Sequence, residues 1–340
     1  MTAAELVRAA LTGPLSAEEA EAAVGAMVEG TATAVQTAAM LSAIATRGAT
    51  AAEVAGGVRA LRQAMVPVHV ADAQGLVDTC GTGGGALTTF NISTAAGLLA
   101  AGAGVRIAKH GNRSFSSRSG SADVLEALGV RIELGPDEAA RVLESAGIVF
   151  LFAPLYHPAM RQVGPVRREL GTPTLFNILG PLANPAFARR QLVGVADPRL
   201  MELVAEALRE LGHERALVVH GAPGMDEFSP LGPTQVVELA GGTLRRWQFD
   251  PAEQLGWQSF VPAELAGADP ADNARLIEGV LAGSTEGAAR AAVVLNAGAA
   301  IYLAGLADTL AEGVTAAERA LRSGAGSACL QRLRAATAAI

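Results

Sequence analysis

The chain has 340 residues and a mass of 34.4 kDa, enough for two domains or for one large domain with a sizeable core. Half of the residues are hydrophobic and only 4% are aromatic, which argues against disorder and favours helices packed closely on a sheet. The formal net charge of −7 argues against a nucleic-acid scaffold, because binding a phosphate backbone needs clustered Lys and Arg. A small anionic substrate stays compatible with a few cations gathered at one site.

Residues 1 to about 66 are predicted to form helices only. Ser16 and Glu19 have the spacing of a capping box, Thr50 is placed to cap the segment that begins at residue 51, and Pro67 ends the region. Three or four short helices without a strand between them predict a small helical domain. No basic segment followed by an apolar stretch begins the chain, so no signal peptide is expected.

From residue 67 on, short apolar runs alternate with helical stretches. Strands are expected from Val77 and at 105–108, 148–152, 191–195 and 216–220. Helices are expected at 93–101, 122–128 and 136–145. This alternation predicts an α/β domain with a largely parallel sheet. Residues 156–182 return to helix and turn, and the last third, from Gly241 on, is predicted only as Ala-rich helices near its end.

Two further features bear on the compartment. The apolar run at 293–306 is shorter than the ~20 residues that a bilayer needs, and it predicts a buried helix. Cys80 and Cys329 lie far apart without metal-type spacing, so we expect free thiols in a reducing cytoplasm.

A glycine-rich segment, DTCGTGGG at 78–85, follows the first expected strand. Its glycines permit positive φ, Gly85 included, and a close approach of the backbone to a ligand. Ser93 and Thr94 then stand at a helix start, where unpaired N–H groups and the positive dipole end favour an anion. The spacing is neither that of a P-loop nor that of a dinucleotide fingerprint. An ordinary glycine-rich turn with a Ser cap is the alternative interpretation.

A basic segment, KHGNRS at 109–114, follows the run at 105–108. The carboxyl end of a strand is where open α/β sheets bind ligands. Lys109, Arg113 and Arg118 supply cations, and neighbouring hydroxyls, Ser116 and Ser117 among them, supply donors for phosphate oxygens. The alternative is a solvated basic loop, which the acidity of the rest of the chain disfavours.

The adjacent carboxylates Asp226 and Glu227 follow the expected strand at 216–220. Mg²⁺ is usually held by one or two carboxylates together with substrate phosphates, so this pair is a candidate metal site. An ordinary exposed acidic pair is the alternative.

A fourth segment combines His157, Arg167 and the turn Gly180-Pro181. Arg is well suited to bidentate binding of a carboxylate. For His157 the alternative interpretation is a purely structural role.

Together these segments resemble the anthranilate phosphoribosyltransferase family. The shared motifs occur in order: GTGG at 81–84, NIST at 91–94, KHGN at 109–112, SGSADVLEALG at 119–129, YHPAM at 156–160, VRRELG at 166–171, FNILGPLANP at 176–185 and DE at 226–227. The resemblance covers residues from about 5 to 330. It implies transfer of the 5-phosphoribosyl group from phosphoribosyl pyrophosphate (PRPP) to the amine of anthranilate in tryptophan biosynthesis, with Mg²⁺ as cofactor.

The resemblance also implies an architecture like that of nucleoside phosphorylases and phosphoribosyltransferases, with the active site between two domains. The small helical domain would comprise 1–66 joined by about 156–182, and the large α/β domain 67–155 and 183–340. A homodimer is implied, with no nucleic-acid or membrane partner.

The site residues that the resemblance implies fall into three groups. Those for PRPP are Gly81, Thr82, Gly83, Gly84, Thr89, Asn91, Ser93, Thr94, Lys109, Asn112, Arg113, Ser114 and Ser121. Those for anthranilate are Gly81, His110, Asn112, His157, Gly180 and Arg167, which would hold the carboxylate. Those for Mg²⁺ are Ser93, Asp226 and Glu227. No general base is assigned, because the aromatic amine of anthranilate is already neutral at pH 7.

The chain departs from the family at Gly85, where an Asp usually follows GTGG. We expect the missing carboxylate to change the response to Mg²⁺. The nearest rival, a pyrimidine nucleoside phosphorylase, shares the architecture, but its GGTxDKLE-type segment is absent and Arg167 is present. A catalytically silent relative that binds nucleic acid would need a basic surface, which an acidic chain disfavours.

Overall fold

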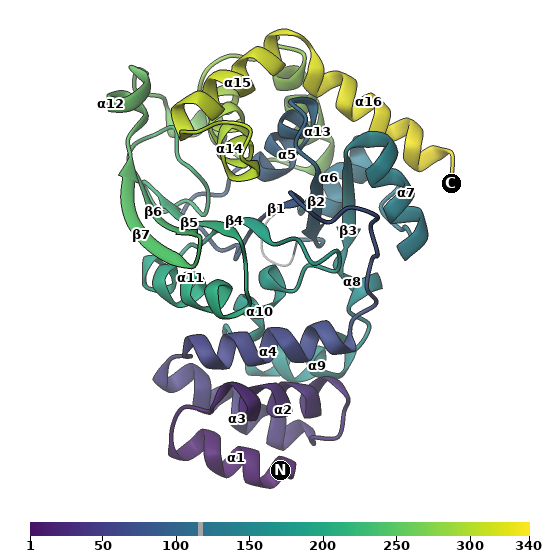
Figure 1. The fold of residues 1–340 in the computed structure, drawn as a ribbon, viewed down its shortest axis with the longest axis vertical. Helices are drawn as coiled ribbons and strands as arrows, with labels where there is room; N and C mark the ends of the chain where they lie inside the picture. Colours follow the sequence, from purple (N-terminus) through teal and green to yellow (C-terminus); the bar gives the residue numbers. More distant parts are fainter. Residues whose placement is uncertain (115–117) are drawn as a thin grey trace.

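The computed structural model describes residues 1–114 and 118–340, and Figure 1 shows their arrangement. The phosphate donors expected at Ser116 and Ser117 lie outside the described residues.

The N-terminal region is helical, as predicted. Its helices are α1 (Ala3–Thr12), α2 (Ala17–Val28), α3 (Ala34–Arg47) and α4 (Ala51–Ala64). A capping box begins each one, and those of Ser16 and Glu19 and of Thr50 and Glu53 confirm the two expected caps. Reciprocal hydrogen bonds between the cap and the third helical residue satisfy N–H groups that a helix start leaves unpaired, so local sequence alone fixes where these helices begin.

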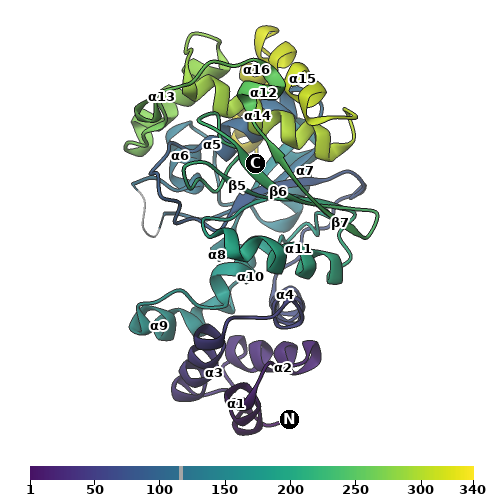
Figure 2. The same cartoon turned by 90° about the vertical axis from the view of Figure 1, so that its left-hand side faces the viewer.

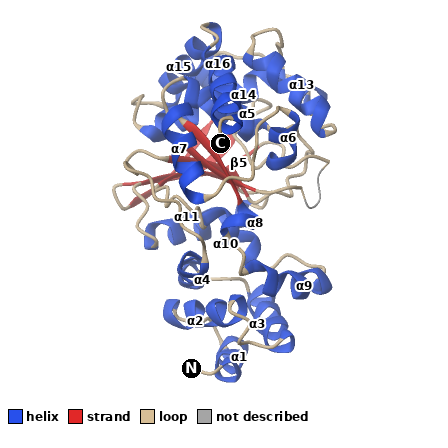
Figure 3. Cartoon of the chain, turned by 90° about the vertical axis from the view of Figure 1, so that its right-hand side faces the viewer, coloured by secondary structure: helices blue, strands red, loops and turns tan. Residues whose placement is uncertain are grey.

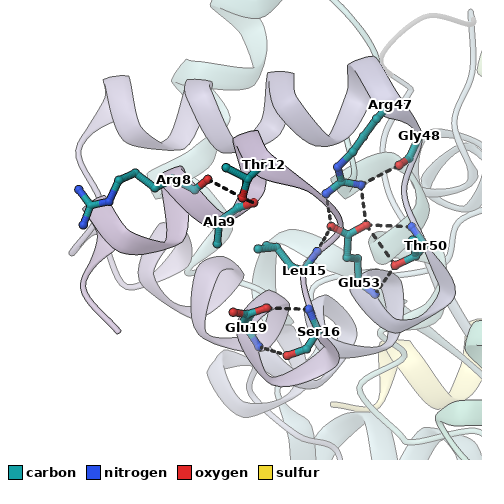
Figure 4. A network of polar contacts seen from close by, with 10 residues as sticks. All are labelled: Arg8, Ala9, Thr12, Leu15, Ser16, Glu19, Arg47, Gly48, Thr50 and Glu53. Carbon is teal, nitrogen blue, oxygen red and sulfur yellow. Dashed lines mark hydrogen bonds and ion pairs between the residues drawn. The ribbon is translucent and has the colours of Figure 1, made fainter.

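Glu53 of α4 also binds the end of α3 and the loop between α1 and α2, as Figure 4 shows. Its carboxylate is fully buried, accepts from the backbone N–H of Leu15 at 3.0 Å and of Thr50 at 2.9 Å, and forms an ion pair with Arg47. Desolvation of the carboxylate opposes ionisation, but the hydrogen bonds from Arg47 and the two backbone groups lower the pKa of Glu53. A buried charge is tolerated here because it is fully hydrogen-bonded.

The strands of the described residues form one seven-stranded sheet in the order β3-β2-β1-β4-β5-β6-β7. They are β1 (Val77–Gly81), β2 (Ile107–Gly111), β3 (Ile148–Phe152), β4 (Arg190–Gly194), β5 (Arg215–Gly221), β6 (Thr234–Ala240) and β7 (Thr243–Phe249). The first five are parallel, and β6 and β7 are antiparallel to their neighbours. The expected largely parallel sheet is confirmed.

The strands differ from the prediction in two places. The strand expected at 105–108 covers Ile107–Gly111, because parallel pairing with β3 continues as far as Gly111 and Phe152. Lys109 and His110 therefore belong to the strand itself. The hairpin β6–β7 was not predicted.

Helices cover both faces of the sheet, as Figures 1 and 3 show. They are α5 (Ile92–Gly102), α6 (Ser121–Ala127), α7 (Pro136–Ala146), α8 (Ala153–Tyr156), α9 (Met160–Leu170), α10 (Phe176–Leu182), α11 (Met201–Glu210), α12 (Pro251–Leu255), α13 (Pro270–Leu281), α14 (Ala288–Ala304), α15 (Leu310–Arg322) and α16 (Ala325–Ala338), with 3₁₀ turns at Pro198–Leu200 and Pro262–Leu265. The apolar run at 293–306 is largely within the buried helix α14, as expected.

Alternate residues of β5 belong to two hydrophobic cores. Leu217 and Val219 pack in the core that includes α5 and α14, whereas Ala216 and Val218 pack in the core that continues into the N-terminal helices. Helix α11 contacts β5, β6 and α4, and so joins the sheet to the helical region. In Figure 2 the chain leaves the sheet through α8 and returns through α10, with α9 beside α3. Helix α9 contacts α2 and α3, so it packs on the N-terminal helices.

Candidate active site

Most of the candidate residues lie where the parallel strands end. In the register of the sheet, Gly81 at the end of β1 faces Gly194 at the end of β4, and Gly194 faces Val219 near the end of β5. The glycine-rich loop continues from β1, the basic segment begins inside β2 and extends past its end, and Asp226 follows β5. Three loops of the sequence therefore meet at one edge of the sheet, as expected for an open α/β fold.

The glycine-rich loop rests on the segment 224–226. The N–H of Gly83 donates to Oδ2 of Asp226 at 3.0 Å, and that of Ala86 donates to the carbonyl of Gly224 at 2.9 Å. A Cβ at Gly81 would lie 2.6 Å from Oδ2 of Asp226, which is closer than such atoms approach. A side chain at Gly81 would therefore displace the Asp226 carboxylate.

Gly85 does not need glycine for its backbone conformation. Positive φ occurs at Gly83 (69°) and Gly84 (81°) but not at Gly85, so the expectation of positive φ there is wrong. A Cβ at Gly85 would stand 3.2 Å from Oδ1 of Asp226. The Cβ would also stand 3.2 Å from the carbonyl of Gly224, so a side chain here is crowded, and a carboxylate at residue 85 would in addition face that of Asp226.

Lys109 is buried rather than solvated. Its ammonium donates to the carbonyl of Thr79 and, at 3.1 Å, to Oγ of Ser93 at the start of α5. Desolvation lowers the pKa of Lys109, while the carboxylates of Asp78 and Glu227 favour its charged form. The solvated-loop alternative does not hold for Lys109.

Asp226 and Glu227 are half-buried beside each other. Desolvation raises the pKa of both carboxyls, and the charge of Asp226 raises that of Glu227 further, although Lys109 and the backbone N–H of Ser93 oppose this. Two neighbouring carboxylates that resist ionisation are stabilised by a cation. Within the described residues no group of three or more His, Cys, Asp and Glu side chains forms a closed metal site. The donor set fits Mg²⁺, which commonly takes two carboxylates and completes its shell with phosphates and water.

The start of α5 lies beside this pair. Thr94 is buried, and its hydroxyl has no hydrogen-bond partner among the described residues. The amide of Asn91 is held by Asn273, which donates to its Oδ1 at 3.0 Å, and by Ser119. Thr89 forms an isolated bridge to Ala266. The NIST motif is thus fixed from neighbouring loops.

The basic segment is arranged differently from the expectation of free cations. Arg113 forms ion pairs with Asp123 at 2.9 Å and Glu126 at 2.5 Å, so its charge is already compensated. Asp123 also accepts from the N–H of Ser114. Ser121 donates to the carbonyl of Asn112 at 3.2 Å. Of the three expected cations, Lys109 is the one whose charge acts on Glu227.

The other candidate residues meet on the opposite side of β2. The rings of His110 and His157 are 5.0 Å apart, and both side chains are buried. Desolvation lowers the pKa of His110 to about 3, helped by His157, and that of His157 to about 4. Their Nε2 atoms have no hydrogen-bond partner among the described residues. Two neutral imidazoles thus lie side by side, each with a buried ring nitrogen that lacks a hydrogen-bond partner among the described residues.

Arg167 and Gly180 belong to this side as well. Arg167 donates to Oδ1 of Asn177 at 3.3 Å, and its guanidinium lies 5.6 Å from the ring centre of Phe176. The turn predicted at Gly180-Pro181 is wrong, because both residues lie within helix α10. The carbonyl of Pro181 accepts from Gln191 at 2.6 Å and from the thiol of Cys80. Helix α10 is thereby tied to β1 and β4.

Sequence reasoning missed the buried polar residues that support the site. Asp78 accepts from the N–H of His110 at 3.1 Å and from Gln191 at 3.2 Å, and Asn184 donates to the carbonyl of Ala108 at 2.8 Å. A polar residue inside an apolar run was the available signal, because buried polar groups need hydrogen-bond partners.

Known proteins similar to this chain agree on one family. Residues 2–65 match the helical bundle domain of a glycosyl transferase family, and residues 73–327 match its α/β domain. The anthranilate phosphoribosyltransferase of Rubrobacter xylanophilus is 52% identical over 329 residues, which cover 96% of this chain and 95% of that protein.

Solved structures lead to the same proteins. The anthranilate phosphoribosyltransferase of Thermus thermophilus superimposes with a TM-score of 0.92 at 43% identity and covers 99% of each chain. That of Saccharomyces cerevisiae, in complex with PRPP and Mg, superimposes with a TM-score of 0.89 at 25% identity and covers 100% of this chain and 98% of that one. In the described part of this chain, no helix has the length and apolar character to cross a membrane.

Proposed function

Because the chain belongs to the anthranilate phosphoribosyltransferase family, we propose that the two sides of β2 divide its two substrates between them. The reaction transfers the 5-phosphoribosyl group from PRPP to the amine of anthranilate, and gives N-(5-phosphoribosyl)anthranilate and pyrophosphate in tryptophan biosynthesis. The observation that carries the division is the alternation of Lys109 and His110 on one strand.

PRPP binds on the side of Lys109. The N–H groups of the loop 81–84, the hydroxyls of Thr82, Thr89, Ser93 and Thr94, and the amide of Asn91 receive its phosphates and ribose. Asn112, Arg113, Ser114 and Ser121 complete this side. A helix start and a glycine-rich loop offer N–H groups without side-chain obstruction, which supports an anionic ligand here.

Mg²⁺ is held by Asp226, Glu227 and Ser93, as the raised pKa values of the two carboxyls support. When bound, Mg²⁺ supplies charge neutralisation for the departing pyrophosphate. Asp226 and Glu227 lie against the N–H groups of Gly83 and Ser93. They therefore occupy donors that an incoming phosphate also needs.

Anthranilate binds on the side of His110. Arg167 pairs with its carboxylate, and Gly81, His110, Asn112, His157 and Gly180 surround the ring. Both imidazoles are neutral at pH 7, so they do not repel the developing cation on the sugar. The amine needs no deprotonation before it attacks the ribose C1, and catalysis rests on positioning and on charge stabilisation.

The organisation of the molecule follows the same proposal. Residues 1–66 with about 156–182 form the small domain, and 67–155 with 183–340 form the large one. Two chains form a homodimer in the cytoplasm, without nucleic-acid or membrane partners. Leu11 and Val35, which stay exposed on the adjoining helices α1 and α3, offer apolar surface for such a contact.

A fluorescence assay of anthranilate consumption tests the function. Activity is expected only when PRPP, anthranilate and Mg²⁺ are all present, and omission of any one should stop it. Phosphorolysis of a pyrimidine nucleoside, measured in parallel, is expected to be absent. The opposite pattern would assign the chain to the phosphorylases that share this architecture.

A further inference from the structure

Asn296 is a polar residue in the middle of a buried apolar helix. It lies in α14, is fully buried, and has Leu295, Ala297 and other small or apolar side chains around it in the helix. Its amide is nonetheless well bonded. Oδ1 accepts from the N–H of Phe228 at 2.9 Å, and Nδ2 donates to the carbonyls of Phe228 and Ala292, each at 2.9 Å. One side chain thus binds both polar backbone groups of a single loop residue.

That loop residue directly follows the acidic pair. The ring of Phe228 is buried and packs edge-on against Phe249, with ring centres 6.3 Å apart. At the other end of the same loop, Gly221 and Met225 exchange backbone hydrogen bonds of 2.9 and 2.7 Å. Asp226 and Glu227 are therefore the two residues between the hydrogen-bonded turn that ends at Met225 and Phe228, whose backbone Asn296 holds.

Asn296 also lies close to Ser93 and Glu227. The three residues line one narrow space together with Thr79 and Leu192. The amide thus contacts the loop from the side on which Ser93 and Glu227 lie.

We propose that Asn296 is a positioning residue for the metal-binding carboxylates, through its clamp on the backbone of Phe228. This role rests on the proposed function of Asp226 and Glu227. The clamp limits the movement of both carboxylates, so the loop presents their oxygens at fixed positions. A shift of the loop by a fraction of an ångström would misplace both at once.

The test compares Asn296→Leu and Asn296→Ser with Thr337→Val. Leu fills the space but leaves the Phe228 backbone groups unpaired. Ser keeps a bond to the carbonyl four residues earlier and leaves room for water, so it is the variant more certain to fold. Thr337 is a buried residue of α16 whose hydroxyl accepts from the N–H of Arg131, and its loss controls for removal of a buried polar group away from the site.

Two quantities are measured beside the thermal midpoint: Mn²⁺ binding by electron paramagnetic resonance in the presence of PRPP, and the KM values for both substrates. Both Asn296 variants are expected to weaken Mn²⁺ binding and to raise KM for PRPP by about tenfold, the equivalent of one to two lost hydrogen bonds, with little change for anthranilate. Thr337→Val should lower the thermal midpoint without either effect.

Unchanged Mn²⁺ binding, or KM values that rise equally for both substrates, would show that Asn296 only supports the fold and would overturn the proposal. Failure of the proposed function is separately visible. In that case the unaltered protein would consume no anthranilate, or Asp226→Asn would leave Mn²⁺ binding intact.

Discussion

The two faces of strand β2 handle charge in opposite ways. On the side of Lys109, an ammonium and two carboxylates share a half-buried space, and the pKa values of both carboxyls are raised. On the side of His110, burial keeps both imidazoles neutral, and Arg167 is the charged candidate residue. Because successive residues of a strand point to opposite faces, one dipeptide separates these environments.

This difference indicates which substitutions should weaken the binding of which substrate. Under the proposed function, the carboxylates on the side of Lys109 are neutralised by Mg²⁺, so removal of its charges should weaken the binding of Mg²⁺ and PRPP. On the side of His110 the proposed ligand is anthranilate, held by Arg167 and by shape, so changes there should weaken the binding of anthranilate alone.

Removal of both carboxylates should have the largest effect. Asp226→Asn with Glu227→Gln should lower kcat/KM by more than about 100-fold, because several kcal/mol of charge stabilisation through the metal are lost. The thermal midpoint should not fall, since the raised pKa values show that the folded protein disfavours the charged forms.

The adjacent pair Asp137 and Glu138 at the start of α7 gives a matched control. Asp137→Asn with Glu138→Gln makes the same chemical change away from the site and should leave kcat/KM unchanged. Undiminished activity in the variant with Asp226→Asn and Glu227→Gln would contradict the assignment of these two residues as Mg²⁺ ligands.

Arg167→Ala should have the next largest effect, confined to one substrate. Loss of a charge-assisted contact costs about 2–3 kcal/mol, so KM for anthranilate should rise roughly 30- to 150-fold while KM for PRPP changes little. The exposed neighbour Arg168 provides the control, and Arg168→Ala should leave both values near those of the parent. An equal rise for both substrates would make Arg167 structural and would erase the contrast between the two faces.

Acid stability tests the neutral imidazoles. The pKa is lowered to about 3 in His110, about 4 in His157 and about 3 in His213, in each case chiefly by desolvation. The unfolded chain binds these protons below about pH 6.5 and the folded chain does not, so stability should fall as pH drops from about 6.5 towards 4.

Asp78 opposes this trend in the same range. Desolvation raises its pKa to about 6, so its contribution to stability is lost as pH rises from about 4 to 6. Thermal midpoints between pH 4 and 7 should therefore rise less steeply in His157→Asn and more steeply in Asp78→Asn than in the parent. Parallel curves for all three proteins would mean that neither group titrates in the way that its burial implies.

The sequence predicts well whatever is encoded locally. A capping box such as that of Ser16 and Glu19 defines a helix start within four residues of sequence. The glycine-rich loop can be recognised from its composition. The hairpin β6–β7 had a local signal that was overlooked. Gly241 and Gly242, with φ of 55° and 79°, separate two alternating segments, and such a pair is typical of a two-residue hairpin. Exposed residues such as Arg245 and Arg246 on β7 obscured the alternation.

Long-range pairing could not be predicted in this way. Asn296 meets Phe228 across 68 positions, and Lys109 meets Ser93 only because β2 and α5 pack side by side. Nothing near Arg113 in the sequence singles out Asp123 and Glu126 as its partners rather than a phosphate. Side-chain partners of this kind depend on the assembled sheet and not on local propensity.

Gly85→Asp should have the smallest effect, and it tests how much charge the side of Lys109 tolerates. The new Cβ would stand 3.2 Å from Oδ1 of Asp226 and from the carbonyl of Gly224, close enough for the carboxylates to repel but without a positive φ to strain the backbone. The parent is expected to tolerate high Mg²⁺ without inhibition, whereas Gly85→Asp should alter the Mg²⁺ dependence by recruiting further metal or metal-bound water.

Gly85→Asn separates charge from bulk, because its amide has nearly the same shape and no charge. If charge is responsible, only the Asp variant changes the Mg²⁺ profile, and both variants share any shift of the thermal midpoint that crowding against Asp226 causes. If the two profiles change together, the space next to Asp226 matters and its electrostatics do not. Three superimposable profiles would make Gly85 a neutral substitution, and the side of Lys109 would then be less sensitive to added charge than its buried carboxylates imply.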